Sequence, residues 1–147
     1  MFEGGQRVPF VAWAPERIPA GSSQDTIVSS IDLLPTVVSL AGASMEQHAM
    51  TIDGVDVSSV LTEGRGSNRN EFLYYSRSGY LEGIRQGKWK LLKVKRRYSL
   101  YDLGSDIAES NDLAKQYPER VEELKQRMVV LGEAIERAKR PRGEFSR

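Results

Sequence analysis

The stretch Tyr80–Ala114, YLEGIRQGKWKLLKVKRRYSLYDLGSDIAESNDLA, decides the fold of this chain. Its pattern predicts three strands in succession, at residues 80–85, 88–94 and 98–103. The middle strand alternates in its first half, because lysines 88 and 90 point to one face while Trp89 and Leu91 point to the other. A glycine after Gln86 and a basic run at 95–97 supply the turns. Such a meander has an apolar face that needs a cover.

Two flanking segments complete this subdomain. Residues 72–76 predict a further strand ahead of the meander, which gives a four-stranded antiparallel sheet. Behind it, Pro118 suits the first position of a long helix that Pro141 stops. Its apolar stripe steps by three and four residues: Val121, Leu124, Met128, Leu131 and Ile135. We expect this stripe to cover the sheet, since about two heptads are too short for a coiled coil. Gly132 inside the helix predicts a bend or close packing.

The first third of the chain has a different pattern. Val8–Ala14 is almost wholly apolar without alternation, which predicts a strand buried on both faces of a parallel sheet. Few neighbouring strands are available, so we expect the rest of that sheet to lie elsewhere. A helix is predicted at Asp32–Ala41, capped by its first residue and closed by Gly42. Its expected apolar face consists of Leu34, Val37, Val38 and Ala41. We therefore divide the chain into residues 1–70 and 71–147.

Bulk composition excludes several classes of function. The chain has 147 residues, of which 39% are hydrophobic and 28% charged, which suits one folded domain. A net charge of +1 provides no global field for nucleic acid or an anionic membrane. No apolar run approaches the ~20 residues of a membrane span, and the N-terminus has no signal-peptide pattern, so an export signal is not expected within this sequence. The absence of cysteine excludes disulfides, thiol catalysis and thiolate metal sites.

No complete catalytic constellation is visible in the residues themselves. His48, the one histidine, lies in a polar loop and is interpreted as a solvated residue. Asp53 and Asp56 could contribute to a metal site, but a turn at Asp53-Gly54 explains them more simply. Asp102 and Asp106 flank a tight loop, where capping or turn formation accounts for them.

Two groups of side chains could instead bind a ligand. A basic run could meet an anionic sugar or phosphate, although we interpret it as the solvated face of an antiparallel strand: Arg85, Lys88, Lys90, Lys93, Lys95, Arg96 and Arg97. Several aromatic residues could stack on a ring substrate, although core packing is favoured for the tryptophan: Tyr74, Tyr75, Tyr80 and Trp89. Glu3-Gly4-Gly5 precedes a predicted strand, so it is not a phosphate-binding loop.

Several blocks, in order, make the chain resemble the C-terminal third of a type I, formylglycine-dependent sulfatase of the arylsulfatase family. The similarity runs from Phe2 to about Leu131. Its blocks are residues 3–9 (EGGQRVP), 13–21 (WAPERIPAG), 30–36 (SIDLLPT), 40–42 (LAG), 53–56 (DGVD), 84–91 (IRQGKWKL) and 100–103 (LYDL), followed by Asp106, Glu109, Asn111 and Leu113-Ala114.

This resemblance implies hydrolysis of a sulfate ester in a whole enzyme. The family's nucleophile is a hydrated formylglycine made from Cys or Ser, beside a calcium ion held by Asp and Asn. Lys and His groups bind the sulfate there. The nucleophile motif lies far upstream of the matching part, and the active-site lysine precedes the Glu-Gly-Gly segment. We therefore expect no catalytic residue, no metal ligand and no cofactor in this chain, with calcium and formylglycine belonging to the full-length enzyme.

The resemblance also implies an architecture and a role. The fold is α+β: one buried strand and a helix belong to an alkaline-phosphatase-like α/β sheet, followed by the antiparallel sheet with its long helix. Loops of this subdomain shape the mouth of the substrate pocket, so Arg77, Ser78 and Tyr80 are candidate substrate-binding residues. Glu3 and Arg7 would brace the sulfate site.

Three roles stay open at this stage. The first is the C-terminal part of a sulfatase acting on a sulfated small molecule or glycan, in a periplasmic, secreted or lysosomal compartment. The second is an independent module that binds anionic glycans through the strand lysines Lys88 and Lys90. The third is a truncated product that self-associates through its exposed first strand. None of them involves nucleic acid or a membrane.

Overall fold

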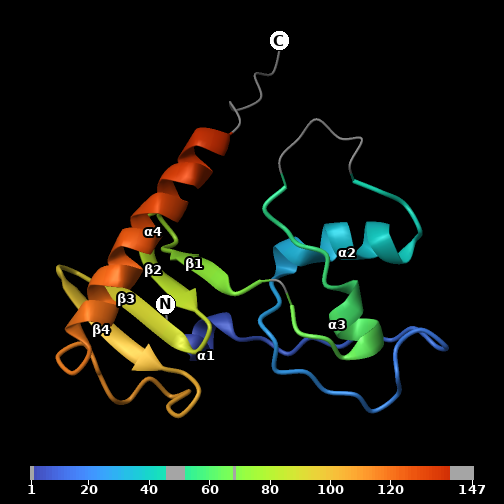
Figure 1. The fold of residues 1–147 in the computed structure, drawn as a ribbon, viewed down its shortest axis with the longest axis horizontal. Helices are drawn as coiled ribbons and strands as arrows, with labels where there is room; N and C mark the ends of the chain where they lie inside the picture. Colours follow the sequence, from blue (N-terminus) through green and yellow to red (C-terminus); the bar gives the residue numbers. More distant parts are fainter. Residues whose placement is uncertain (1, 46–51, 68, 140–147) are drawn as a thin grey trace, which may run out of the picture. The chain divides into compact units, whose positions relative to one another are not determined.

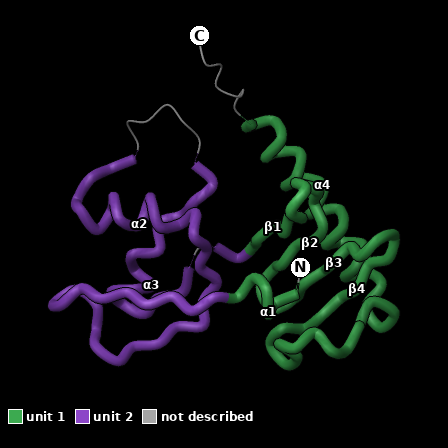
Figure 2. Tube along the Cα trace, turned by 180° about the vertical axis from the view of Figure 1, so that it is seen from behind, with its two compact units in different colours: residues 1–7, 71–147 green, residues 8–70 purple. Residues whose placement is uncertain are grey.

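The structure, a computed structural model, describes residues 2–45, 52–67 and 69–139. Figure 1 shows the succession of elements: α1 (Glu3–Gln6), a 3₁₀ turn η1 (Ser30–Asp32), α2 (Leu33–Leu40), α3 (Ser58–Glu63), β1 (Glu71–Tyr75), β2 (Leu81–Gln86), β3 (Trp89–Val94), β4 (Arg97–Asp102) and α4 (Pro118–Ala138). The chain forms two compact units (Figure 2). Unit 1 contains residues 1–7 and 71–147, and unit 2 contains residues 8–70.

Unit 1 is built on a single antiparallel sheet with strand order β1-β2-β3-β4. The four predicted strands are confirmed, with ends that differ by at most one residue. Ile84 pairs with Leu91, which pairs in turn with Leu100, so one row of apolar side chains crosses three strands. Gly87 adopts a left-handed φ of +57° between β2 and β3, a conformation that glycine reaches without steric cost.

Helix α4 covers one face of this sheet, which we call the α4 face (Figure 1). Leu124 and Met128 pack with the buried row on the strands, while Val121 and Leu131 pack at the margin. The predicted cover of the sheet is therefore confirmed. A Cβ added at Gly132 would lie 2.7 Å from Leu81 Cδ2, so helix and sheet do pack closely there, as the sequence predicts.

The opposite face, which we call the α1 face, carries Tyr74, Lys90, Leu92 and Tyr101. Leu92, Tyr101 and Leu103 form a small buried apolar cluster. The ring of Phe2 meets Tyr101 edge-on at 6.4 Å between centroids, which places the segment at residues 2–6 over this face. Residues 1–7 therefore belong with the sheet, whereas the predicted division placed them with residues 8–70.

Unit 2 departs from the sequence prediction at its start. Val8–Ala14 forms no strand, and its apolar side chains are exposed, with Val8 at 74%, Val11 at 88% and Trp13 at 85% of full exposure. The predicted buried strand is thus wrong for this structure. A strand needs a hydrogen-bonded neighbour, and the described residues of unit 2 contain no other strand.

The helix predicted at 32–41 is present as η1 followed by α2, and Gly42 ends it at a φ of +75°. The expected apolar face is not the buried one. Leu34 and Val37 are 58% and 61% exposed, whereas Pro35 and Thr36 are buried. The reason is that this helix turns its Thr36 side toward the rest of unit 2, where the hydroxyl accepts a hydrogen bond from the Val57 N–H at 3.0 Å.

Asp32 is fully buried but does not cap α2 as predicted. Its carboxylate accepts hydrogen bonds from the backbone N–H groups of Ser29 and Val55 and from the guanidinium of Arg69. Arg69 also donates to the carbonyl of Asp53. Burial opposes ionisation of Asp32, but these bonds outweigh it and lower the pKa of the carboxyl. This network fixes the turn at residues 53–55.

Candidate functional site

The most unusual feature of unit 1 is a buried charged group on the α1 face. The Lys90 side chain is completely buried. Its Nζ lies 2.8 Å from Glu3 Oε1 and 2.9 Å from Glu109 Oε1. The first contact is a hydrogen bond, and the second is an ion pair without hydrogen-bond geometry. Both carboxylates are themselves buried, so water screens these charges very little.

Further polar groups complete this cluster. Glu3 Oε1 also accepts a hydrogen bond from the Tyr74 hydroxyl at 3.2 Å, and Glu3 Oε2 lies 3.7 Å from the guanidinium of Arg85. The backbone N–H of Glu3 donates to Glu109 Oε2. Two carboxylates therefore face two cations, Lys90 and Arg85. We call these five residues the Lys90 cluster; their formal charges cancel, as a buried ionic group requires.

The surroundings shift the pKa values within this cluster. Burial alone would raise the pKa of the Glu3 carboxyl, but the hydrogen bond and charge of Lys90, together with Arg85, outweigh burial and lower it. Burial and the neighbouring Glu3 carboxylate raise the pKa of the Tyr74 phenol. Glu3 is consequently an anion, and Tyr74 a neutral hydrogen-bond donor, at physiological pH.

Glu109 holds its place at a conformational cost. Its φ is +55°, in the left-handed region, where a non-glycine residue costs about 1–3 kcal/mol. A glycine there would relieve the strain but would provide no carboxylate. The surrounding contacts to Lys90 and to the Glu3 N–H account for the glutamate at this position.

This arrangement is suited to holding chain segments together rather than to chemistry. Lys90 has no exposed surface from which to attack or bind an external anion. The prediction that the strand lysines form a solvated face is therefore wrong for Lys90. A signal was present in the sequence: Leu91 and Leu92 follow one another, and two adjacent apolar residues in a strand indicate that both faces are covered. No local sequence pattern indicated that Glu109 is the partner of Lys90; Glu109 was named only among the residues of the family resemblance.

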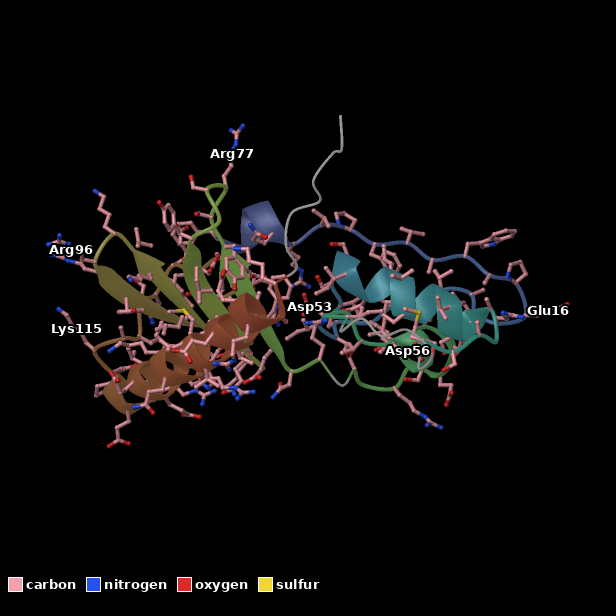
Figure 3. All side chains as sticks on the ribbon, turned by 90° about the horizontal axis from the view of Figure 1, so that it is seen from above. Glu16, Asp53, Asp56, Arg77, Arg96 and Lys115 are labelled. Carbon is pink, nitrogen blue, oxygen red and sulfur yellow. The ribbon has the colours of Figure 1, made fainter. Side chains whose placement is uncertain are left out.

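The other basic residues of the run do not converge on one site. Lys88 is 57% exposed at its side chain and pairs with Asp102 at 2.7 Å. Arg85 belongs to the Lys90 cluster. The remaining four lie on the exposed end of the β3–β4 hairpin, where Figure 3 shows Arg96 extending outward: Lys93, Lys95, Arg96 and Arg97.

The candidate substrate-binding residues Arg77, Ser78 and Tyr80 lie together at the tip of the β1–β2 hairpin. This tip is closed by two hydrogen bonds between Ser76 and Tyr80, and Gly79 takes a φ of +81°. Tyr80 is 72% exposed, and Figure 3 shows Arg77 pointing away from the sheet. The structure thus presents all three side chains on one exposed turn. Their role in binding substrate stays a prediction.

The aromatic residues divide between core and surface. Trp89 packs against the α4 core and lies 5.3 Å from the ring of Tyr117, so the predicted core role is confirmed. Tyr74 is buried in the Lys90 cluster, and Tyr75 is half-buried.

The acidic candidates act in turns. Asp56 Oδ1 accepts a hydrogen bond from the Ser58 N–H at 2.8 Å, just ahead of α3, while Asp53 contributes its carbonyl to Arg69. Asp102 and Asp106 accept backbone N–H groups of the loop after β4. In residues 2–45, 52–67 and 69–139 no three His, Cys, Asp or Glu side chains converge to hold a metal ion. These residues therefore do not fit a calcium site. His48 lies outside the described residues.

Comparison with known proteins places this geometry in a family. The family described as N-sulphoglucosamine sulphohydrolase, C-terminal, matches residues 1–134. The chain belongs to this sulfatase family. The expected C-terminal portion of a sulfatase is thereby confirmed, and the match spans both α1 and most of α4.

Individual sulfatases agree with this assignment. The chain is 31% identical to rat (Rattus norvegicus) arylsulfatase G over 92% of its own length, and 44% identical to human (Homo sapiens) arylsulfatase G over 70%. Among solved structures, Ps i-CgsB superposes with a TM-score of 0.65 and 30% identity over 80% of this chain and 27% of its own. That protein has also been solved in complex with k-i-k-neocarrahexaose.

The sulfatase chain described here spans less than a third of these relatives: 30% of the rat enzyme and 19% of the human one. What the whole enzymes do therefore reaches this chain only as a proposal. Within the described residues, no helix combines the length and the apolar character that crossing a membrane would require.

Proposed function

We propose that this chain is the C-terminal part of a sulfatase, in which it forms one wall of the substrate pocket and supplies no catalytic group. The observation that carries the proposal is the family match over residues 1–134 together with the four-stranded sheet and α4. The nucleophile, its calcium ion and the cations that bind the sulfate would belong to the upstream part of such an enzyme. The compartment would be lysosomal, secreted or periplasmic.

The tip of the β1–β2 hairpin is the part of this chain that would line the substrate pocket. A guanidinium forms paired, charge-assisted hydrogen bonds with the oxygens of an anionic group such as a sulfate, and Arg77 is exposed at this tip. Tyr80 presents an aromatic face on which a sugar ring can pack. A sulfated glycan is the substrate class that we propose, supported by the carrageenan oligosaccharide bound to Ps i-CgsB.

The first test separates this chain from the whole enzyme. The chain alone, incubated with an aryl sulfate and calcium, is expected to give no turnover. Turnover by the chain alone, abolished by substitution of its lysines or tyrosines, would show that it has its own chemistry and would refute the proposal.

The second test addresses the hairpin tip in a full-length sulfatase that contains this sequence. Arg77→Ala is expected to raise KM for a sulfated oligosaccharide about 10-fold or more, since a hydrogen bond to a charged group is lost. The matched control is Arg96→Ala, an exposed arginine on the other hairpin (Figure 3), for which KM should not change. If Arg77→Ala and Arg96→Ala have the same KM, the hairpin tip does not bind substrate.

A second candidate function rests on the exposed basic end of the β3–β4 hairpin, residues 93–97. An independent module could bind heparin-like polymers through this end, with an affinity that falls as salt rises. Lys90 takes no part, because it is buried. Retention on heparin at low salt that is lost in Lys95→Ala with Arg96→Ala would support this function, and no retention at low salt excludes it.

Self-association is a third candidate, supported by the exposed apolar side chains of Val8, Val11 and Trp13. Two copies could bury this segment against one another. Small-angle scattering over a range of concentrations distinguishes the cases, because a mass that stays monomeric contradicts self-association.

A further inference from the structure

Unit 1 is assembled from two pieces of chain that are far apart in sequence. Residues 1–7 form one piece and residues 71–147 the other, with all of unit 2 between them. The pieces meet on the α1 face of the sheet. The hydrogen bond from Lys90 to Glu3 spans 87 residues, and that from the Glu3 N–H to Glu109 spans 106.

Phe2 and Glu3 of the short piece have matching groups on the sheet and in the loop after β4. The Glu3 carboxylate meets Lys90, and its backbone N–H meets the Glu109 carboxylate. The Phe2 ring packs edge-on to Tyr101 and lines a shallow hollow with Leu92. The short piece thus meets a shallow hollow, a buried cation and a carboxylate that accepts a backbone N–H.

The two glycines that follow contribute no side chain to this recognition. A Cβ added at Gly4 or at Gly5 would have no atom within 4 Å, so neither position is pressed against the sheet. Both residues are exposed, as is Gln6. The sheet therefore contacts this segment through an aromatic residue followed by a glutamate, and Gly4 and Gly5 add no side chain to the contact.

We propose that the α1 face is a peptide-docking site, occupied in this chain by its own residues 2–5, and that Lys90 selects the glutamate of a Phe-Glu sequence. The docking site goes beyond the function proposed above, because it concerns how the chain recognises a peptide segment and not a sulfate ester. A covalently attached segment has an effective concentration near millimolar, so a free peptide binds only when the resident segment is weakened.

Hydrogen–deuterium exchange on the whole chain tests the docking. Two amides report it, because the Gly5 N–H donates to the Phe2 carbonyl and the Arg7 N–H to the Glu3 carbonyl. In Glu3→Gln and in Lys90→Met, exchange of residues 3–7 should become about 10-fold faster or more, while β2 and β3 stay protected. Lys88→Met, at an exposed lysine in the turn between β2 and β3, is the matched control and should exchange like the unmodified chain.

A peptide added in trans tests the selectivity. Glu3→Lys places a cation opposite Lys90 and should release the resident segment, leaving the site open. Acetyl-Phe-Glu-Gly-Gly-Gln-Arg-amide should then bind this variant and not the unmodified chain. The same peptide with glutamine in place of glutamate should bind with a Kd that is higher by about 10-fold or more.

Three results would overturn the docking site. They are unchanged protection of residues 3–7 in Glu3→Gln, failure of the peptide to bind Glu3→Lys, and equal binding of the two peptides. Should Lys90→Met unfold the chain as a whole, the conservative Glu3→Gln variant still decides the question, because it keeps Lys90 and Glu109 paired.

Discussion

The two faces of the sheet are buried by opposite means. On the α4 face, Leu91 and Leu100 are covered by the apolar stripe of one long helix. On the α1 face, Lys90 is buried just as fully, but by two carboxylates from distant parts of the chain. Apolar burial tolerates small displacements because it has no direction. A buried ion pair is stable only when its geometry is satisfied. The α4 face therefore holds the subdomain together, and the α1 face specifies which segment joins it.

Removal of Lys90 should have the largest effect on stability. Lys90→Met retains most of the apolar stem but leaves Glu3 and Glu109 adjacent, buried and without their central cation. Removing one partner of a buried ion pair costs about 3–5 kcal/mol. Urea unfolding followed by circular dichroism gives this free energy. The matched change on the other face, Leu100→Ala, should cost about 2–5 kcal/mol through the cavity it leaves.

Coupling between substitutions distinguishes the two mechanisms where the magnitudes overlap. Glu3→Gln combined with Lys90→Met should cost clearly less than the sum of the two single changes, because the contact between Glu3 and Lys90 is lost in either single variant and can be lost only once. Glu3→Gln combined with Leu100→Ala should be additive. Additivity in both pairs would mean that Lys90 acts only through its volume, and the contrast between the faces would fail.

Acid should weaken the α1 face and leave the α4 face unaffected. The pKa of Glu3 in the folded chain lies below its ordinary value of 4.5. The stability that this carboxylate contributes is thus complete above the unfolded pKa and is lost as pH falls through the folded pKa. Other carboxyl groups with lowered pKa, among them Asp32 and Glu71, add to the same trend, so the comparison must be made between variants.

The measurement is the free energy of unfolding as a function of pH between about 7 and 2. Glu3→Gln should show a shallower loss in acid than the unmodified chain. Leu100→Ala should displace the curve downward at every pH without changing its slope. A Glu3→Gln curve parallel to that of the unmodified chain would show that Glu3 is not held as an anion in the fold.

Two non-glycine residues with a left-handed backbone allow the cost of backbone strain to be measured separately from the contribution of the side chain. Lys95 has a φ of +59° in the exposed β3–β4 turn, and Glu109 has a φ of +55° in the buried cluster. Lys95→Gly should stabilise the chain by about 1 kcal/mol, because glycine adopts this conformation without steric cost. Glu109→Gly gains the same relief but loses a buried carboxylate, and the net result should be a destabilisation of about 1–3 kcal/mol. Thermal unfolding of both variants checks the signs. If Glu109→Gly stabilises the chain, the Glu109 carboxylate does not contribute to the stability of the Lys90 cluster.

The sequence predicted the α4 face well and the α1 face poorly. Period-two alternation and the three–four stripe are local patterns, so they identified the strands, α4 and their mutual packing. Lys90 obeys the same alternation, yet its burial depends on Glu3 and Glu109, which are distant in sequence and carry no local signal. The pattern at residue 90 was therefore interpreted as a solvated face.

Unit 2 shows a related limit. The apolar run Val8–Ala14 and the stripe at Leu34 and Val37 predict burial, but burial also needs a partner surface, and both are exposed in the structure. Exposed turn residues such as Arg77 and Tyr80 carry no periodic signal at all. Arg77 became a candidate only through the family resemblance, and Tyr80 also as an aromatic residue that could stack on a ring substrate. Neither has a local pattern that fixes its role, so the substrate wall stays a prediction while the sheet behind it is confirmed.

The smallest expected effect concerns the glycine in α4. Gly132→Ala places a methyl group 2.7 Å from Leu81 Cδ2, the end of a flexible side chain that can rotate away. Alanine also favours the helix by about 1 kcal/mol over glycine. The two terms should nearly cancel, leaving a change within about 0.5 kcal/mol of zero in urea unfolding.

Gly83 provides the matched position on the sheet, in a row with Tyr74 and Leu92 on the α1 face. A Cβ there would lie 2.7 Å from the carbonyl oxygen of Leu91, a backbone atom fixed by the strand pairing. Gly83→Ala should therefore cost about 1–3 kcal/mol as overpacking. A cost of that size for Gly132→Ala as well would mean that α4 is as rigidly seated as the strands. The apolar face would then be no more tolerant of displacement than the ionic one, because both would depend on a single fixed geometry.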